Sequence, residues 1–300
     1  MKTNKSMLCV FGFMLLFTAV AATAADAPKR TFKFKPVEIP GAPDTVVNGV
    51  NNEGALVGQY KDSSGGLHGY ILNGKKLIPL DDPKGSDTEC LAINSLNVIV
   101  GYYLNSSKHP QGFIYYPKTE MFSDIGPSGS LYSYASGIND NGVVTGTYQD
   151  STGPEHGFVW NGTTYQQLDY PGASWTWAFG INNKGLITVI WDDPAGNVES
   201  SLYNSKTKKY IGLINVPGAV NTYAHAVDSA GDVVYTWQAS ATGPYHGELC
   251  TNCAHKSRQY YEFNDSKGNQ TLGEGINDHE LVCGDYETAT SRIEGFTATY

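Results

Sequence analysis

Three observations predict an all-β fold that closes into a ring, a six-bladed β-propeller with four-stranded blades. A short motif recurs six times, each copy reads as strand-length segments separated by turns, and the two chain ends carry complementary parts of the sixth copy. Tandem units of this kind bury a continuous core by packing on their neighbours. Because a catalytic group is normally needed only once, we look for function in the positions that differ between copies.

The repeat is defined by an Asn or Asp that opens a turn of the Asn-Asp-Asn-Gly type. The six anchor residues are Asn51, Asn94, Asn139, Asn182, Asp228 and Asn277. Their successive spacings of 43, 45, 43, 46 and 49 residues are typical of propeller blades. Six residues before each anchor stands Thr or Ser, one before it Val or Ile, and nine after it Tyr or Trp. Fixed offsets in every copy indicate one structural unit that is repeated.

Each copy contains signals for four short strands. In the third copy an inner strand ends at Asn139, and the turn at 139–142 returns the chain antiparallel through 143–150. A looser turn leads to a third strand at 156–160, and an Asn-Gly pair leads to a fourth at 163–170. Apolar residues alternate along these segments without a helical period, so we expect no helices.

The chain ends predict how the ring closes. The sixth copy runs through three strands and stops at Tyr300, without a fourth. Residues 32–45, FKFKPVEIPGAPDT, begin with a fourth-strand sequence that has no companion strands before it. We predict that this segment completes the last blade as its outermost strand, which removes an exposed sheet edge. An open β-solenoid is the alternative, but open solenoids rarely leave complementary fragments at both ends.

Residues 1–24 have the features of a secretory signal peptide. Lys2 and Lys5 precede an apolar run from Met7 to about Ala22, and small residues follow at the cleavage site. Cleavage leaves one propeller domain over residues 31–300. The 18 remaining basic and 29 acidic residues give a net charge of −11, which disfavours nucleic acid and anionic lipid surfaces as partners. We expect an exported monomer, periplasmic or extracellular, that does not insert into a membrane.

Four cysteines remain after cleavage: Cys90, Cys250, Cys253 and Cys283. Export permits disulfides, and Cys250 and Cys253 form the only close pair. A local structural disulfide is favoured over a redox pair or a metal half-site, because no second Cys-x-x-Cys exists to complete a zinc site. We therefore expect neither a bound metal nor another cofactor.

The repeat resembles that of the extracellular HAF-repeat proteins, in which a His-Ala-Phe tripeptide follows a GIN-x-x-G-x-V-x-G motif. The matching residues in the third copy are Gly137-Ile138-Asn139, Gly142, Val144 and Gly146, followed by His156-Gly157-Phe158. The tripeptide has Gly in place of Ala, and the second, fourth and sixth copies lack its His. The resemblance covers nearly all of the mature chain. It implies export and a repeat-built β fold, and it implies no established activity.

Two sets of recurring polar residues are assigned to structure. The first set begins the third strand of three different copies, so we expect its members to lie far apart and to make structural hydrogen bonds rather than one metal site: His68, His156 and His246. The second set precedes a Gly by three residues, so we expect it to start turns rather than to bind calcium: Asp62, Asp150 and Asp193.

Two positions of the inner strand differ from copy to copy, and we place the candidate site there. Three residues before the anchor the copies read Asn48, Leu91, Ser136, Phe179, His225 and Glu274. Five residues before it they read Val46, Glu89, Tyr134, Trp177, Tyr223 and Leu272. Inner strands surround the channel of a propeller, so these side chains should face the channel or one of its mouths. The predicted ligand-binding residues are Asn48, Tyr134, Trp177, Phe179, Tyr223, His225 and Glu274.

The order of the blades should bring His225, Glu274 and Asn48 together, with the aromatic residues on the adjoining arc. Aromatic faces beside a few polar side chains suit a carbohydrate or another small ligand, so we predict a secreted binding protein. A His225–Glu274 acid–base pair would instead suit a lyase or hydrolase. A third alternative is a structural scaffold that contacts a protein partner. The sequence contains no Gly-x-Ser-x-Gly, phosphate-loop or His-Glu-x-x-His motif that would support an enzyme.

Overall fold

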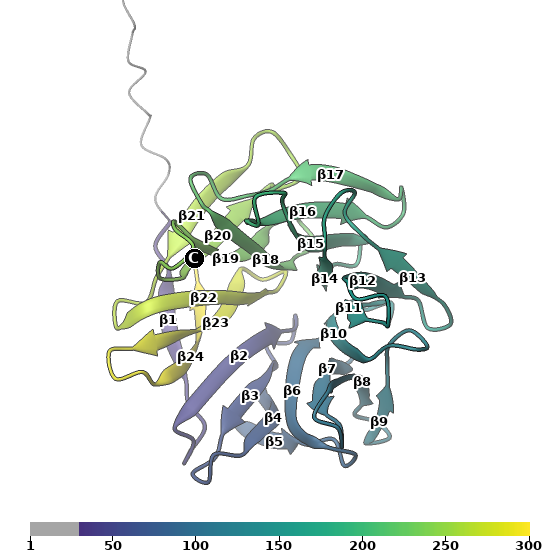
Figure 1. Ribbon diagram of the computed structural model, residues 1–300. Coiled ribbons are helices and arrows are strands. Elements are labelled where there is room, and N and C mark those ends of the chain that lie inside the picture. Colours follow the sequence, from purple (N-terminus) through teal and green to yellow (C-terminus); the bar gives the residue numbers. More distant parts are fainter. Residues whose placement is uncertain (1–29) are drawn as a thin grey trace, which may run out of the picture.

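The computed structural model describes residues 30–300 and confirms the predicted fold class. Six four-stranded antiparallel sheets, here called blades I to VI, surround a central axis (Figure 1). The predicted signal peptide, residues 1–24, lies outside the described residues. Among residues 30–300 there is no helix long and apolar enough to cross a membrane.

The strands of each blade follow one another in sequence from the channel outward, except for the last strand of blade VI. Blade I contains β2 (Asp44–Val50), β3 (Leu56–Lys61), β4 (Leu67–Asn73) and β5 (Lys76–Leu80). Blade II contains β6 (Ser86–Ile93), β7 (Ile99–Leu104), β8 (Pro110–Tyr116) and β9 (Met121–Asp124). Blade III contains β10 (Tyr132–Ile138), β11 (Val144–Gln149), β12 (Glu155–Trp160) and β13 (Tyr165–Leu168). Blade IV contains β14 (Thr176–Ile181), β15 (Leu186–Asp192), β16 (Val198–Asn204) and β17 (Lys209–Leu213). Blade V contains β18 (Asn221–Val227), β19 (Val233–Gln238), β20 (His246–Thr251) and β21 (Gln259–Phe263). Blade VI contains β22 (Gly268–Ile276), β23 (Leu281–Thr288), β24 (Ile293–Thr299) and β1 (Lys33–Val37).

The N-terminal strand β1 closes the ring. It lies beside β24, although the two strands come from opposite ends of the chain (Figure 1). Lys33 pairs with Thr299 and Val37 with Gly295, and the Phe34 ring packs on Phe296 with centroids 4.9 Å apart. The prediction that an N-terminal strand completes the last blade as its outermost strand is therefore confirmed.

The anchor residues join neighbouring blades through a ring of side-chain hydrogen bonds. Each anchor Oδ1 accepts the backbone N–H of the residue four positions later, as Asn51 does from Ala55 at 2.9 Å. The five anchor amides donate from Nδ2 to the next anchor carbonyl: Asn51 to Asn94 (3.1 Å), Asn94 to Asn139 (3.2 Å), Asn139 to Asn182 (3.1 Å), Asn182 to Asp228 (2.7 Å) and Asn277 to Asn51 (2.9 Å). Asp228 has no amide, so the ring is open between blades V and VI.

Small residues let the inner strands approach one another. A Cβ atom on Gly137 would lie 2.4 Å from the carbonyl oxygen of Phe179, and one on Gly180 would lie 2.6 Å from that of His225. Behind the inner strands, buried apolar side chains of adjacent blades pack together, as Val100 of blade II and Val144 of blade III do in one cluster. The core therefore lies between the blades, and each blade depends on both neighbours.

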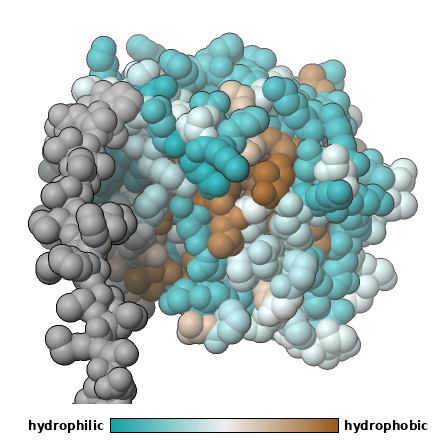
Figure 2. Space-filling model, turned by 90° about the horizontal axis from the view of Figure 1, so that it is seen from above, coloured by the Kyte–Doolittle hydropathy of each residue, from teal (hydrophilic) through white to brown (hydrophobic). Residues whose placement is uncertain are grey.

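The predicted disulfide between Cys250 and Cys253 is confirmed, and it closes the turn after β20. Cys90 and Cys283 are free and buried. The face of the molecule seen in Figure 2 is mostly hydrophilic, with hydrophobic residues gathered in a limited area. Ile211 and Leu213 of β17 are among the exposed apolar side chains, at 43% and 47% exposure.

Candidate functional site

Every inner strand carries a β-bulge at the variable position three residues before its anchor. In blade I the register shifts between Val47 and Gly49, and the same shift recurs in the other five blades. A bulge inserts an unpaired residue and redirects its side chain. The side chains redirected in this way line a channel cavity of 110 Å³: Asn48, Leu91, Ser136, Phe179, His225 and Glu274.

A ring of branched aliphatic side chains divides the channel. It consists of the residues one before each anchor: Val50, Ile93, Ile138, Ile181, Val227 and Ile276. These residues line both the 110 Å³ cavity and a second cavity of 80 Å³ at the anchor end. The two ends of the channel are therefore separate environments, and the variable residues belong to only one of them.

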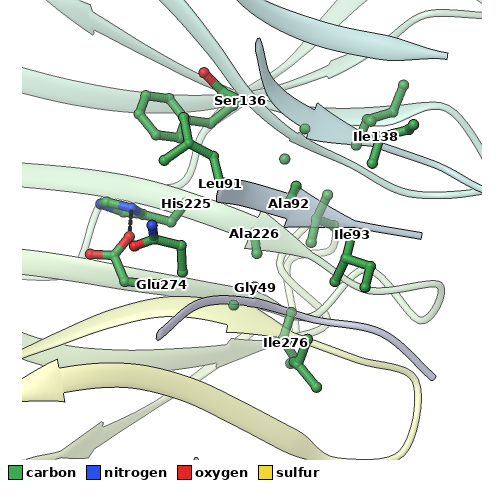
Figure 3. Close-up of a pocket in the computed structure, with 18 residues that line it drawn as sticks. Gly49, Leu91, Ala92, Ile93, Ser136, Ile138, His225, Ala226, Glu274 and Ile276 are labelled. Atoms are coloured by element: carbon green, nitrogen blue, oxygen red, sulfur yellow. Dashed lines mark ion pairs between the residues drawn. The ribbon is translucent and has the colours of Figure 1, made fainter. Parts of the chain in front are cut away.

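The polar side of the channel cavity holds a close acid–base pair. His225 Nδ1 lies 2.6 Å from Glu274 Oε2, and the two side chains are 16% and 15% exposed (Figure 3). The two side chains form an ion pair when the imidazole is protonated. Asn48 donates instead to Gln59 Oε1 (2.6 Å) and to the Cys90 carbonyl (3.0 Å). Asn48 shares the cavity with His225 and Glu274 but is held by blades I and II.

A second, buried carboxyl group, that of Asp285 in β23, adjoins this pair. Burial, followed by the charge of Glu274, raises the pKa of Asp285 well above its usual range. Two nearby carboxylates disfavour simultaneous ionisation, so Asp285 remains neutral to a higher pH than an exposed Asp. The His225–Glu274 contact is therefore accompanied by a buried carboxyl group of raised pKa.

A third cavity, of 270 Å³ and here called the aromatic pocket, adjoins the channel cavity. Its lining residues are Leu91, Tyr102, Tyr134, Ser136, Thr147, Glu155, Trp177 and Phe179. They come from blades II, III and IV. Leu91, Ser136 and Phe179 line both cavities, so the aromatic pocket and the channel share a wall.

Glu155 holds the aromatic side chains in place. Its Oε2 accepts a hydrogen bond from Trp177 Nε1 at 2.6 Å, and its Oε1 accepts one from the Tyr132 hydroxyl at 2.5 Å. The rings of Tyr102 and Tyr134 meet edge to face, with centroids 4.8 Å apart and planes inclined by 75°. These contacts fix ring orientations across two blade boundaries, as a preformed binding site requires.

The aromatic pocket is electrostatically negative. Burial raises the pKa of Tyr134, and the charges of Glu155 and Glu89 raise it further. Burial also raises the pKa of Tyr102, with Glu89 as the next cause. Both tyrosines therefore remain neutral phenols. Burial also raises the pKa of Glu89, which leaves Glu155 as the acidic group of the pocket lining.

The structure groups most of the predicted site residues but not all of them. Tyr134, Trp177 and Phe179 meet in the aromatic pocket, while His225 and Glu274 meet in the channel. Phe179 connects the two groups, since its ring centroid lies 5.2 Å from that of His225. Tyr223 is not among the residues that line the aromatic pocket, and its ring faces Tyr245 at 6.2 Å.

Four residues of the two cavities and their surroundings were not predicted: Tyr102, Thr147, Glu155 and Asp285. Three of them occupy one repeat position, eight residues after the anchor, where the copies read Gln59, Tyr102, Thr147, Ile190, Thr236 and Asp285. Each of these residues pairs directly with the variable residue five before the anchor, as Thr147 does with Tyr134. Paired residues share one sheet face. The variability of this second position was the signal that could have identified them.

The recurring His residues have the structural contacts expected of them. His68, His156 and His246 stack on or pack against Tyr60, Tyr148 and Trp237, with centroids 5.3, 5.4 and 4.7 Å apart. The Nδ1 atoms of these His residues lie 2.9 to 3.1 Å from a carboxylate oxygen of Asp81, Asp169 and Glu262 respectively. Asp62, Asp150 and Asp193 each accept a backbone N–H from two residues later, which is the expected turn.

No family model and no curated protein matches the chain. Membership of the HAF-repeat family therefore stays a prediction. Among solved structures, TolB from Acinetobacter baumannii is similar with a TM-score of 0.57 and 9% identity, over 82% of this chain and 63% of that one. The chain thus spans less than two thirds of that TolB.

Fungal lectins are similar along more of their length. The six-bladed fucose-recognising lectin from Aleuria aurantia has a TM-score of 0.52 and 11% identity, over 88% of this chain and 93% of that one. A mutant of AofleA from Arthrobotrys oligospora has a TM-score of 0.56 and 11% identity, over 89% of this chain and 86% of that one. At such low identities the similarity shows the propeller fold alone.

Proposed function

We propose that this chain is an exported binding protein that captures a small ligand in the aromatic pocket. One observation carries the proposal: side chains from three blades converge on a concave, largely apolar pocket, and most of them occupy positions that vary between copies. Residues that maintain the blade recur in all six copies, so blade architecture does not account for Tyr134 or Trp177. Small-ligand sites combine an apolar lining with a few fixed polar groups in this way.

Export is supported by two features. The Cys250–Cys253 disulfide suits an oxidising compartment, and the resemblance to HAF-repeat proteins implies the same location. Carbohydrate is one ligand class to test, because sugars stack on aromatic rings and propeller lectins of similar fold recognise fucose. That property belongs to those lectins and reaches this chain only as a hypothesis.

The test compares ligand binding by two tyrosine variants of the mature protein. Tyr134→Leu removes a ring from the aromatic pocket, whereas Tyr116→Leu removes a ring that is 37% exposed elsewhere on blade II. Methyl α-fucoside, other monosaccharides and small organic ions are screened by thermal shift, since a ligand of the native state raises the melting temperature. We expect at least one shift that Tyr134→Leu removes and Tyr116→Leu preserves. Shifts that persist in Tyr134→Leu, or a complete lack of shifts, would contradict the proposal and favour a scaffold that contacts a protein partner.

Acid–base catalysis is a second candidate, and the 2.6 Å contact between His225 and Glu274 favours it. A lyase or hydrolase needs a proton acceptor and a proton donor near the substrate, and Asp285 adds a buried carboxyl group whose pKa is raised. Turnover of chromogenic glycosides and uronides by the mature protein and by His225→Asn tests this candidate. Turnover that His225→Asn abolishes would support an enzyme, whereas equal rates in both proteins would reject a catalytic role for the pair.

A further inference from the structure

We infer that the aromatic pocket selects an organic cation of the quaternary or highly methylated ammonium class. This inference rests on the proposed function, because it concerns the ligand of the same pocket. Four properties of the pocket support it: the inclination of its rings, the sign of its charge, its shortage of free hydrogen-bonding groups and its size.

The aromatic rings of the pocket are inclined to one another and do not form one flat surface. Tyr102 and Tyr134 are inclined by 75°, and Trp177 and Phe179 by 46° with centroids 6.3 Å apart. A flat sugar face stacks best on a flat ring surface, whereas a roughly spherical head group contacts several inclined rings at once. Aromatic faces attract a cation through the quadrupole of the ring, most strongly for Trp.

The charge of the pocket suits a cation. Glu155 is the one charged residue among the described residues that line it. No Lys, Arg or His of residues 30–300 belongs to the lining. An anionic ligand would therefore meet repulsion, and a cation would meet both a carboxylate and ring faces.

The pocket has few polar groups left for a sugar. Both oxygens of Glu155 already accept hydrogen bonds, from Trp177 and Tyr132. Ser136 and Thr147 are 8% and 4% exposed, so only a small part of each residue is accessible to a ligand. A sugar that enters loses hydration at every hydroxyl and needs replacement partners. A quaternary ammonium group has no N–H, so it needs no hydrogen-bond partner in the pocket.

The size of the pocket limits the part of a ligand that can enter. Its volume of 270 Å³ lies just below the range of about 300–1,000 Å³ that is usual for small-molecule sites. A compact head group fits such a volume, whereas a polymer segment or an oligosaccharide does not. The remainder of a longer ligand would extend away from the pocket.

The first experiment compares choline with 3,3-dimethylbutan-1-ol, its uncharged analogue of equal shape, by calorimetric titration of the mature protein. We expect choline to bind at least about tenfold more tightly, because only the charge differs. Glu155→Gln should remove most of that difference, because it lowers the affinity for choline much more than the affinity for the uncharged alcohol. Equal affinities for choline and the alcohol in the wild-type protein would overturn the inference and leave a merely apolar pocket.

A second arm separates this inference from the proposed function. Methyl α-fucoside is titrated alongside choline, with Tyr134→Leu as the pocket variant and Tyr116→Leu as its control. If the fucoside binds, choline does not, and Tyr134→Leu removes binding, the pocket is a ligand site but the cation inference is wrong. If Tyr134→Leu leaves every affinity unchanged, the proposed function and the cation inference both fail.

Discussion

Asn182 donates its Nδ2–H to the carbonyl oxygen of Asp228 at 2.7 Å, but Asp228 has no amide with which to continue the ring to Asn277. Every other anchor is an Asn that donates to the next blade. Burial, as the largest cause, raises the pKa of Asp228 from its ordinary 3.8 to about 6. Only the protonated carboxyl group could donate toward Asn277, so the ring contains one pH-dependent position.

Asp228→Asn should stabilise the protein, and more so at high pH. The folded state holds the Asp228 proton more tightly than the unfolded state, so the contribution of Asp228 to wild-type stability is greatest below about pH 4 and falls as the pH rises through about 6. The partly solvated carboxyl group limits the gain at pH 8 to about 1–2 kcal/mol. Urea unfolding at pH 4.5 and pH 8 measures the gain in the free energy of unfolding, and Glu53→Gln, at an exposed position, is the control. An equal gain at both pH values would contradict this account.

Glycines at the channel should tolerate Ala according to the space available. A Cβ on Gly180 would lie 2.6 Å from the His225 carbonyl oxygen, whereas one on Gly49 would have its nearest neighbours at 3.1 Å. Gly180→Ala should therefore lower the free energy of unfolding by about 1–3 kcal/mol, and Gly49→Ala by less than about 1 kcal/mol. Denaturant midpoints of the two variants test the order. A larger loss in Gly49→Ala would show that blade spacing at the channel is set elsewhere.

The cysteines should differ sharply in reactivity. Cys90 and Cys283 are buried, burial raises the pKa of both thiols, and Cys250 and Cys253 are joined. We expect no thiol of the folded mature protein to react with a maleimide, two to react in denaturant, and four after reduction in denaturant. Mass spectrometry counts the adducts. Four adducts in denaturant without a reductant would disprove the disulfide.

The closing strand β1 should contribute to stability through Phe34. Its ring packs on Phe296, whereas Lys35 is exposed on the same strand. Phe34→Ala should cost about 2 kcal/mol, and Lys35→Ala should change stability by less than about 0.5 kcal/mol. Thermal and urea unfolding of both variants gives the comparison. Equal midpoints would mean that β1 adds little to the closed ring.

The fold was predictable because the six copies of the repeat can be aligned, so that each position is compared across six blades. The recurring Asn, Gly and hydroxyl positions could be recognised from their offsets alone, and the split sixth copy indicated how β1 pairs with β24. The hydrogen bond from the anchor amide to the next blade was not predictable, because turn formation alone already accounts for an Asn at this position. The two roles use different atoms, Oδ1 within the blade and Nδ2 between blades.

The sequence predicted which positions of the inner strands contribute to the candidate site, but not the direction in which their side chains point. Variable positions identified Tyr134, Trp177 and Phe179, but a β-bulge decides which of them face the channel and which the aromatic pocket. The bulges leave no single residue signature, since Asn, Leu, Ser, Phe, His and Glu all occupy them. Glu155 comes from another strand, β12, and only the cross-blade bond to Trp177 reveals its part in the pocket.

The aromatic pocket is the proposed ligand site, and the indole N–H signals of the five tryptophans report on ligand binding there. Nuclear magnetic resonance spectra of indole-¹⁵N-labelled mature protein are recorded during titration with choline and with methyl α-fucoside, and Trp177→Phe assigns the Trp177 signal. We expect the bound ligand to shift the Trp177 signal, because that N–H contacts Glu155 in the pocket wall, and to leave the signals of Trp160 and Trp237 in place. Binding that moves Trp160 or Trp237 while Trp177 stays unchanged would contradict it.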